Sequence, residues 1–230
     1  MTAPIVNCGD RSPREINREI RSLVAAGHRE IQVRETRAQH NLGVGLVEPV
    51  MLDYVGSVGY YCGGLMDGPT VHVSGSAGWG VAEGMMAGTV VVDGNAGNGA
   101  GAAIRGGALV IKGDVGARAG VSIKGGLILI GGDCGYMTGF MGQKGTIIIH
   151  GDAGEALGDS MYETVIYVGG SVTDLGSDAV VEAMSPLDRT FLTRTLLAYD
   201  FDASRDWKKV VSGRKLWNFD RHEAAWQAIL

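Results

Sequence analysis

Three aspartates that recur every 19 residues, Asp114, Asp133 and Asp152, are the first candidates for chemistry in this chain. Other small polar residues share their phase in the repeat: Ser57, Ser76, Asn95 and Ser171. If consecutive repeats stack like neighbouring strands, carboxylates about 5 Å apart could bind a cation or share a proton. Asp, Asn and Ser are also common turn residues, and a glycine precedes each of these positions. The pattern favours turns, with a cation or proton site as the alternative.

Other residue types that carry chemistry lack the spacing that catalysis or cofactor binding needs. The five histidines show no metal-ligand spacing, and no Ser or Cys stands in a recognisable nucleophile motif. The glycines at 97, 99 and 101 neither complete a dinucleotide fingerprint nor open a helix. Arg105 and Lys124 share a phase and are best explained as a solvated edge. We therefore predict no catalytic, cofactor-binding or metal-binding residue in this chain.

Glycine defines the elements that must position these residues, because it recurs in three columns with a period of 19 residues. The first column holds Gly56, Gly75, Gly94, Gly113, Gly132, Gly151 and Gly170. The second holds Gly59, Gly78, Gly97, Gly116, Gly135 and Gly154, and the third holds Gly63, Ala82, Gly101, Gly120, Gly139 and Gly158. A fixed period near 20 residues indicates a solenoid of stacked copies. Each column predicts a positive φ or a close approach between coils.

A short apolar run, rich in β-branched residues, precedes each glycine of the first column. One strand per repeat, with glycine turns between strands, predicts an all-β solenoid: a right-handed parallel β-helix of about seven coils. The first and third residues of each triplet should point inward, and the middle residue outward. This outer column begins with Asp53 and His72 and then becomes apolar, with Val91, Val110, Leu129, Ile148 and Tyr167. Such a stripe must be covered, either by the chain's own terminal helices or by another subunit.

The chain divides into three segments. Residues 1–30 are expected to form a helical cap, because Ser12, Pro13 and Glu15 make a capping box at a helix start. Residues 31–173 form the β-helix. Residues 174–230 lose the glycines and are expected to form a partly helical docking tail.

The tail should contain an amphipathic helix from Pro186 to Tyr199 and a short final helix over 221–229. One side of the first helix would carry Leu187, Phe191, Leu192 and Leu196. Three of the four tryptophans lie in the tail: Trp207, Trp217 and Trp226. We expect these aromatic residues either to pack back on the β-helix or to contact another subunit.

The composition argues against several kinds of partner. The formal net charge is −5 and no basic run occurs, so neither nucleic acid nor an anionic membrane is expected. No apolar stretch is long enough to span a bilayer, and the N-terminus lacks the pattern of a secretion signal. The three cysteines lie far apart, as is common in a reducing compartment. We expect a cytoplasmic protein.

Two glycine-rich segments carry a family resemblance. Gly132–Gly139 reads GDCGYMTG, and Gly97–Gly101 reads GNGAG. A helix over Ile16–Ala26 leads into the apolar run Ile31–Val33. Over about residues 12–173, these features resemble the GXGXG β-helix domain that closes the large subunit of glutamate synthase and also occurs as a free-standing subunit.

The resemblance implies a non-catalytic structural subunit of a glutamate-synthase-like complex, most similar to N-methylglutamate synthase. That enzyme type converts glutamate and methylamine to N-methylglutamate and ammonia. The resemblance places the chemistry in two partners of a hetero-oligomer: an amidotransferase-like subunit and a subunit with FMN, with or without an iron–sulfur cluster. The choice between ammonia and methylamine stays open, because no residue of this chain can be placed at a reacting centre.

Two alternatives stay open beside this interpretation. Formyltransferase/hydrolase and formylmethanofuran dehydrogenase complexes carry similar GXGXG subunits. A stand-alone β-helix enzyme or binding protein is the other alternative. The Trp-rich tail departs from the glutamate synthase domain, so the docking geometry of that domain does not transfer to this chain.

Overall fold

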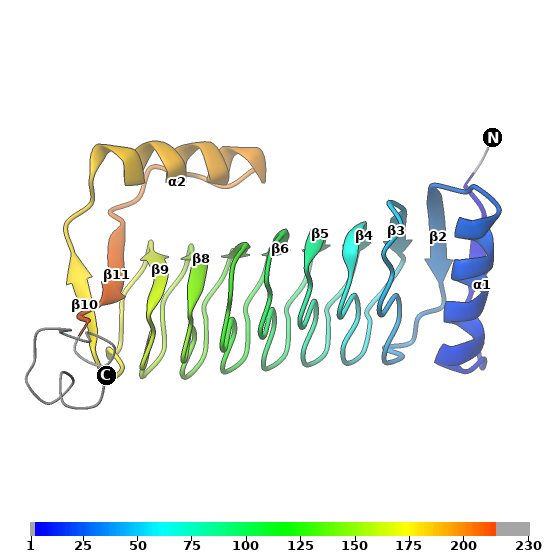
Figure 1. The fold of residues 1–230 in the computed structure, drawn as a ribbon, viewed down its shortest axis with the longest axis horizontal. Helices are drawn as coiled ribbons and strands as arrows, with labels where there is room; N and C mark the ends of the chain where they lie inside the picture. The colour runs from blue at the N-terminus through cyan, green and yellow to red at the C-terminus, as the bar shows by residue number, and fades with distance from the viewer. Residues whose placement is uncertain (1–2, 215–230) are drawn as a thin grey trace, which may run out of the picture.

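The structure, a computed structural model, describes residues 3–214 as a rod of stacked coils (Figure 1). The strands are β1 (Ile5–Asn7), β2 (Glu30–Arg34), β3 (Met51–Tyr54), β4 (Asp67–Val73), β5 (Ala87–Val92), β6 (Ala108–Ile111), β7 (Leu127–Ile130), β8 (Lys144–Ile149), β9 (Glu163–Val168), β10 (Ala179–Glu182) and β11 (Lys208–Ser212). The helices of this range are α1 (Pro13–Ala25) and α2 (Pro186–Ala198). Helix α1 crosses the N-terminal end of the rod, whereas α2 lies along its side (Figure 1).

Consecutive coils pair through parallel strands in a constant register. The order of strands in the sheet follows the sequence from β1 to β9 and then ends with β11 and β10. Leu52 of β3 lies opposite Val71 of β4, which lies opposite Val90 of β5, so the sequence period is the coil length. A second ladder of single bridges runs from Val58 to Val172. The predicted solenoid of about seven coils is confirmed.

The core lies inside the coils and is built from the inward residues of the triplets. One inner column is fully buried along its whole length: Leu52, Val71, Val90, Leu109, Ile128, Ile147 and Ile166. A second is equally buried: Tyr54, Val73, Val92, Ile111, Ile130, Ile149 and Val168. Burial of each such side chain contributes about 1.5–3 kcal/mol. Because every coil buries its apolar side chains against the next, the stack is continuous.

The glycine columns meet two different steric needs. In the third column the backbone has positive φ, +65° at Gly63 and +78° at Gly139, and Ala82 takes +58° in the same phase. In the first column φ at Gly151 is ordinary, but a Cβ there would lie 2.6 Å from the carbonyl carbon of Gly132 in the coil below. Both explanations offered by the sequence therefore hold, although Gly56 of the first column also has a positive φ of +112°.

The N-terminal end of the rod is closed by α1. Ser12 and Glu15 exchange side-chain and backbone hydrogen bonds, which confirms the predicted capping box. The buried face of α1 consists of Ile16, Ile20 and Val24. Strand β1, which the sequence pattern did not indicate, pairs in parallel with β2 and covers its edge.

The C-terminal end is closed by two strands of the tail, of which β11 runs against the direction of the coil strands and β10 runs with it. Strand β11 pairs antiparallel with β9, and β10 pairs antiparallel with β11. The tail was expected to be helical apart from loops, so these two strands are an addition to that prediction. The final helix expected over 221–229 lies outside the described residues.

Helix α2 confirms the helix predicted from Pro186 to Tyr199, but its packed face differs. Leu192 and Leu196 are buried, whereas Leu187 is 82% exposed. The prediction that Leu187 shares their side is wrong. At about 100° per residue, Leu187 lies half a turn around the helix from Leu196.

Candidate functional site

The aspartate column is a ladder of hydrogen bonds along the rod. Oδ1 of Asp114 accepts from the N–H of Asp133 at 2.9 Å, and Oδ1 of Asp133 accepts from the N–H of Asp152 at 2.7 Å. Asp152 in turn accepts from the N–H of Ser171 at 2.7 Å. These bonds to Ser171 hold the pKa of Asp152 below its usual range. In the structure each of these carboxylates accepts a hydrogen bond from the backbone of the next coil, which gives the column a structural role.

Asp133→Ala and Asp133→Asn distinguish this ladder from a cation site. Alanine removes the acceptor of the Asp152 N–H and should lower the free energy of unfolding by up to about 1 kcal/mol. Asparagine keeps a carbonyl oxygen in place and should restore most of that loss. Urea unfolding measures both, with and without millimolar calcium, which should shift neither midpoint. A calcium-dependent rise that only the wild type shows would contradict the structural role.

The predicted partner stripe is covered by the chain's own tail. Val110, Leu129 and Ile148 are fully buried, and Tyr167 is 5% exposed. They form one cluster with Leu192, Leu196 and Trp207. Val91, at the end of the stripe, is half-buried. The sequence left two covers open, a terminal helix of the same chain or another subunit, and the structure has the helix. The four buried residues of the stripe, from Val110 to Tyr167, therefore pack against this chain's own tail.

Polar contacts fix α2 over this stripe. The hydroxyl of Tyr167 donates to Oδ1 of Asp188 at 2.6 Å. Nζ of Lys209 lies 3.3 Å from Oδ2 of Asp188 and 2.9 Å from Glu182. Burial would raise the pKa of Asp188, but hydrogen bonds from Ser185, Tyr167 and Lys209 outweigh it and lower that pKa. The first turn of α2 is therefore held by a charged group bonded on several sides.

The rest of the tail, up to residue 214, also lies against the solenoid. Trp207 is 7% exposed, and its ring lies 6.0 Å from that of His150. Nζ of Lys112 donates to the carbonyl of Tyr199 at 2.7 Å and lies over the ring of Phe201. Trp207 therefore packs back on the β-helix. The other two predicted contact residues, Trp217 and Trp226, lie outside the described residues.

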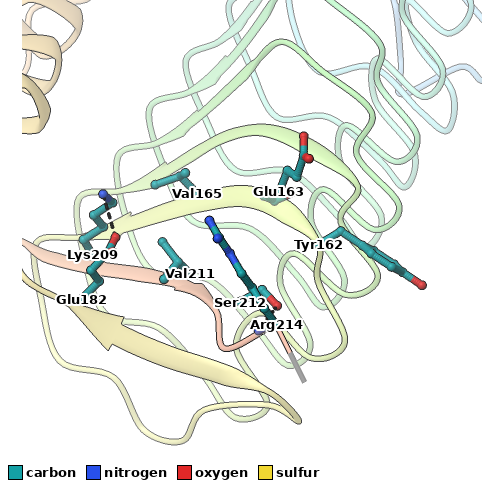
Figure 2. A pocket seen from close by; sticks show the side chains of 9 residues that line it. Tyr162, Glu163, Val165, Glu182, Lys209, Val211, Ser212 and Arg214 are labelled. Atoms are coloured by element: carbon teal, nitrogen blue, oxygen red, sulfur yellow. Dashed lines mark hydrogen bonds and ion pairs between the residues drawn. The ribbon is translucent and has the colours of Figure 1, made fainter. Parts of the chain in front are cut away.

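A cavity of about 630 Å³ opens at the C-terminal end, between β9, β10 and β11 (Figure 2). Lys209 and Glu182 face each other across one side of it in an ion pair, and Tyr162 points away from Val211 (Figure 2). Oγ of Ser212 donates to Asp178 at 3.0 Å, so this hydroxyl is engaged. The residues that line the cavity include neither His nor Cys. These contacts are those of a tail packed on the last coil.

A histidine bridges two carboxylates on the uncovered half of the outer column. Nδ1 of His72 lies 2.9 Å from Oδ1 of Asp53, and Nε2 lies 2.9 Å from Oδ2 of Asp93. Gln32 donates to the other oxygen of Asp53 at 3.0 Å. Burial lowers the pKa of His72, but the hydrogen bonds and charges of both aspartates outweigh it and raise that pKa. The imidazolium form ties three successive coils together.

This bridge predicts a pH dependence of stability. Because the folded pKa of His72 is raised, its contribution is complete below the unfolded pKa of about 6.5 and is lost as the pH rises through the folded value. The His72 side chain is 41% exposed, so the contribution should stay below about 1 kcal/mol. Urea midpoints between pH 6 and pH 9 should fall in the wild type. His72→Gln should flatten that slope, and an equal slope in both proteins would refute the bridge.

A shallow trough on the rod is lined by exposed aromatic side chains. It has a volume of about 530 Å³. Aromatic rings stand at both ends: Trp79 and Tyr61 at one, Tyr136 at the other. Between them lie mainly small residues, including Gly80, Gly99, Ala102 and Ala117. We call this surface the axial trough.

The sequence contains a periodic pattern that indicates the axial trough, but it lies outside the strands on which our prediction was based. Tyr60, Trp79 and Tyr136 share one phase of the repeat, with Asn98 and Ala117 between them. That phase falls in the turns after the strands, where side-chain direction depends on how the coil folds back. A column of aromatic residues in the turns, interrupted by short side chains, would have indicated a surface feature.

The described residues offer no arrangement for a metal ion. Between residues 3 and 214, no group of three or more His, Cys, Asp or Glu side chains could hold one. Cys8, Cys62 and Cys134 are free and buried, and burial raises the pKa of Cys62 to about 12. At neutral pH that thiol is protonated and a poor nucleophile. No helix of the same range is long and apolar enough to cross a membrane.

One curated protein is similar to this chain over part of its length. No protein-family model matches it. Protein GlxC of Rhizobium meliloti (strain 1021) is similar. The two are 44% identical over 71 residues, which make up 30% of this chain and 31% of GlxC. The match therefore spans under a third of the relative.

Proposed function

We propose that this chain is a non-catalytic structural subunit of a glutamate-synthase-related complex. The observation that carries the proposal is the similarity to GlxC in a chain built from GXGXG repeats. In the finer form of the proposal, the complex is an N-methylglutamate synthase. The chain would hold an amidotransferase-like subunit and an FMN subunit in register, so that an amine passes between their sites without loss.

The bonding of the polar residues supports a structural role. The aspartate column is engaged with backbone N–H groups, and Asp188 is engaged with α2 and Lys209. His72 bridges two carboxylates that belong to the coils on either side of its own. Each of these groups joins one part of the fold to another, as is expected of a structural subunit.

Exposed apolar side chains support a role in assembly. The outer face of α2 presents Leu187, Phe191 and Leu197, which are 82%, 40% and 62% exposed. The axial trough presents further aromatic residues on another flank. Apolar surface of this kind usually marks a protein–protein contact. Two separate surfaces suit a subunit that holds two partners.

Purification of the tagged chain from its host tests the proposal. We expect it to elute with a yellow partner whose released cofactor has the absorption spectrum of FMN, together with an amidotransferase-like chain. Glutamate-dependent conversion of methylamine by that complex would support the finer form. Recovery as a lone monomer, or with a metal-bearing amidohydrolase-like partner and no flavin, would contradict it.

A further inference from the structure

The axial trough has walls that are fixed before any partner binds. Tyr60 stacks between His40 and Trp79, with ring centroids 4.4 Å and 5.4 Å away. One face of Trp79 is therefore supported by a stack of rings along the rod. The Trp79 side chain is still 53% exposed, and Tyr136 at the far end is 47% exposed. A preformed wall of this kind loses little conformational entropy on binding.

The gap between the walls spans two coils. Asn98 and Ala117 occupy the aromatic phase in those coils, so the ring column stops after Trp79 and resumes at Tyr136. At about 4.8 Å per coil, the two walls lie about 14 Å apart along the rod. Gly80, Gly99 and Ala102 line the space between them. Side chains this small allow another backbone to approach closely.

The backbone that lines the trough has no unpaired edge for a strand to join. The N–H of Gly80 donates to the carbonyl of Asn98, and the N–H of Gly99 donates to the carbonyl of Ala117, both at 2.9 Å. Strand addition requires a row of free N–H and C=O groups. A helix satisfies its own backbone groups, and so it is the form of polypeptide that this surface can accept.

We infer that the axial trough binds about two turns of an amphipathic helix of a partner subunit, laid along the rod axis between the two walls. The molecule already packs a helix in this way, because α2 lies along the rod with Leu192 and Leu196 over the outer column (Figure 1). Residues three or four apart on a helix have Cβ atoms about 5–6 Å apart, close to the spacing of the coils. One apolar side chain of the helix can therefore meet each coil.

The charges at the trough specify the partner further. Glu83 and Arg118 lie two coils apart, about 10 Å along the rod. Neither has an ion-pair partner among residues 3–214. The bound helix should carry Lys or Arg beside Glu83 and, about seven residues away, Asp or Glu beside Arg118. These two contacts fix the direction of the helix.

Among residues 3–214, a second copy of this chain offers no helix of that description. The most apolar exposed helix surface of that range is the outer face of α2, with Leu187 and Phe191. The acidic residue of that helix, Asp188, is already bonded to Tyr167 and Lys209. It is not free to pair with Arg118. The observations therefore favour a different chain.

The inference rests on the proposed function, and photo-crosslinking in the purified complex tests it. p-Benzoylphenylalanine would replace Ala102 in the trough and, as a matched control, Ser171 on the aspartate ladder. From Ala102 we expect one crosslinked peptide of a partner subunit. That peptide should come from a helix with apolar residues three and four positions apart. It should carry a basic residue for Glu83 and, about seven positions away, an acidic residue for Arg118. Ser171 should not yield that peptide.

Charge reversal provides the second measurement. Glu83→Lys and Arg118→Glu should each weaken retention of that partner by about tenfold without changing the thermal midpoint of the isolated chain. Replacing the basic residue of the crosslinked helix by an acidic one, or its acidic residue by a basic one, should restore retention of the partner by the matching variant. An intact flavin complex with no trough crosslink, or with a crosslink to a second copy or to an extended segment, would overturn the inference alone. A helical crosslink to a partner without flavin would support the inference and contradict the proposed function.

Discussion

Leu129→Lys is expected to release α2 from the solenoid. Leu129 is fully buried in the cluster that contains Leu192, Leu196 and Trp207. An ammonium group there would lose its hydration among the apolar side chains that pack on Leu129. An uncompensated buried charge costs about 3–5 kcal/mol. That loss is comparable with the whole stabilisation that two buried leucines of a short helix provide.

The apolar side chains form two separate clusters, so the release of α2 in Leu129→Lys should be observed as a separate unfolding transition. The cluster under α2 is separate from the main core inside the coils. In a background with Trp79, Trp217 and Trp226 replaced by Phe, we therefore expect the Trp207 fluorescence transition to move to much lower urea, while the β-sheet signal in circular dichroism persists to higher urea. Leu129→Met, which keeps the volume, should shift the fluorescence midpoint little. Val91→Lys, at the half-buried end of the stripe, should have a small effect.

Coincident and unchanged transitions in Leu129→Lys would contradict the placement of α2 on the outer column. A simultaneous loss of both signals would show that the rod depends on its tail for folding. The same variant bears on the predicted partner contacts. If the Lys variant keeps its fold but loses partner subunits, the tail position matters for assembly.

The sequence predicted the solenoid well because its determinants are local and repeated. Each coil must turn at the same phase, so glycine appears in columns, and each coil buries the same two positions, so Leu52 and Tyr54 find equivalents along the chain. The capping box at Ser12 is equally local. Strands β1, β10 and β11 were missed because their pairing partners lie elsewhere in the chain, and short runs such as Ile5–Asn7 carry no periodic signal of their own.

The surface was harder to predict than the core. The outer stripe from Val91 to Tyr167 required a cover, but nothing local in the sequence distinguished a helix of the same chain from a partner. The choice depends on the path of the chain after residue 174, which places Leu192 and Leu196 over the stripe. The axial trough was missed because exposure in turns depends on coil shape, whereas alternation along strands does not.

Gly151→Ala is expected to destabilise the rod although it adds a single methyl group. A Cβ at this position would lie 2.5 Å from the carbonyl oxygen of Gly132 and 2.6 Å from its carbonyl carbon. Those atoms belong to the backbone of the neighbouring coil, which is fixed by the N–H of Gly151 donating to that carbonyl. The clash cannot be relieved by a side-chain rotation, so the coils must separate. Overpacking of this kind costs about 1–3 kcal/mol, and a broken ladder adds to it.

Gly64→Ala is the matched control, because φ at Gly64 is not positive and its Cβ would meet backbone atoms no closer than 3.3 Å. Thermal unfolding should show a much lower midpoint for Gly151→Ala and a small change for Gly64→Ala. In a solenoid each coil is stabilised chiefly by its neighbours, so a fault in one interface weakens the stack on both sides. Hydrogen exchange should therefore increase most in β7 and β8, whose coils meet at Gly132 and Gly151, and least near α1. Uniform exchange along the rod, or equal midpoints for the two variants, would contradict close coil contact as the reason for this glycine column.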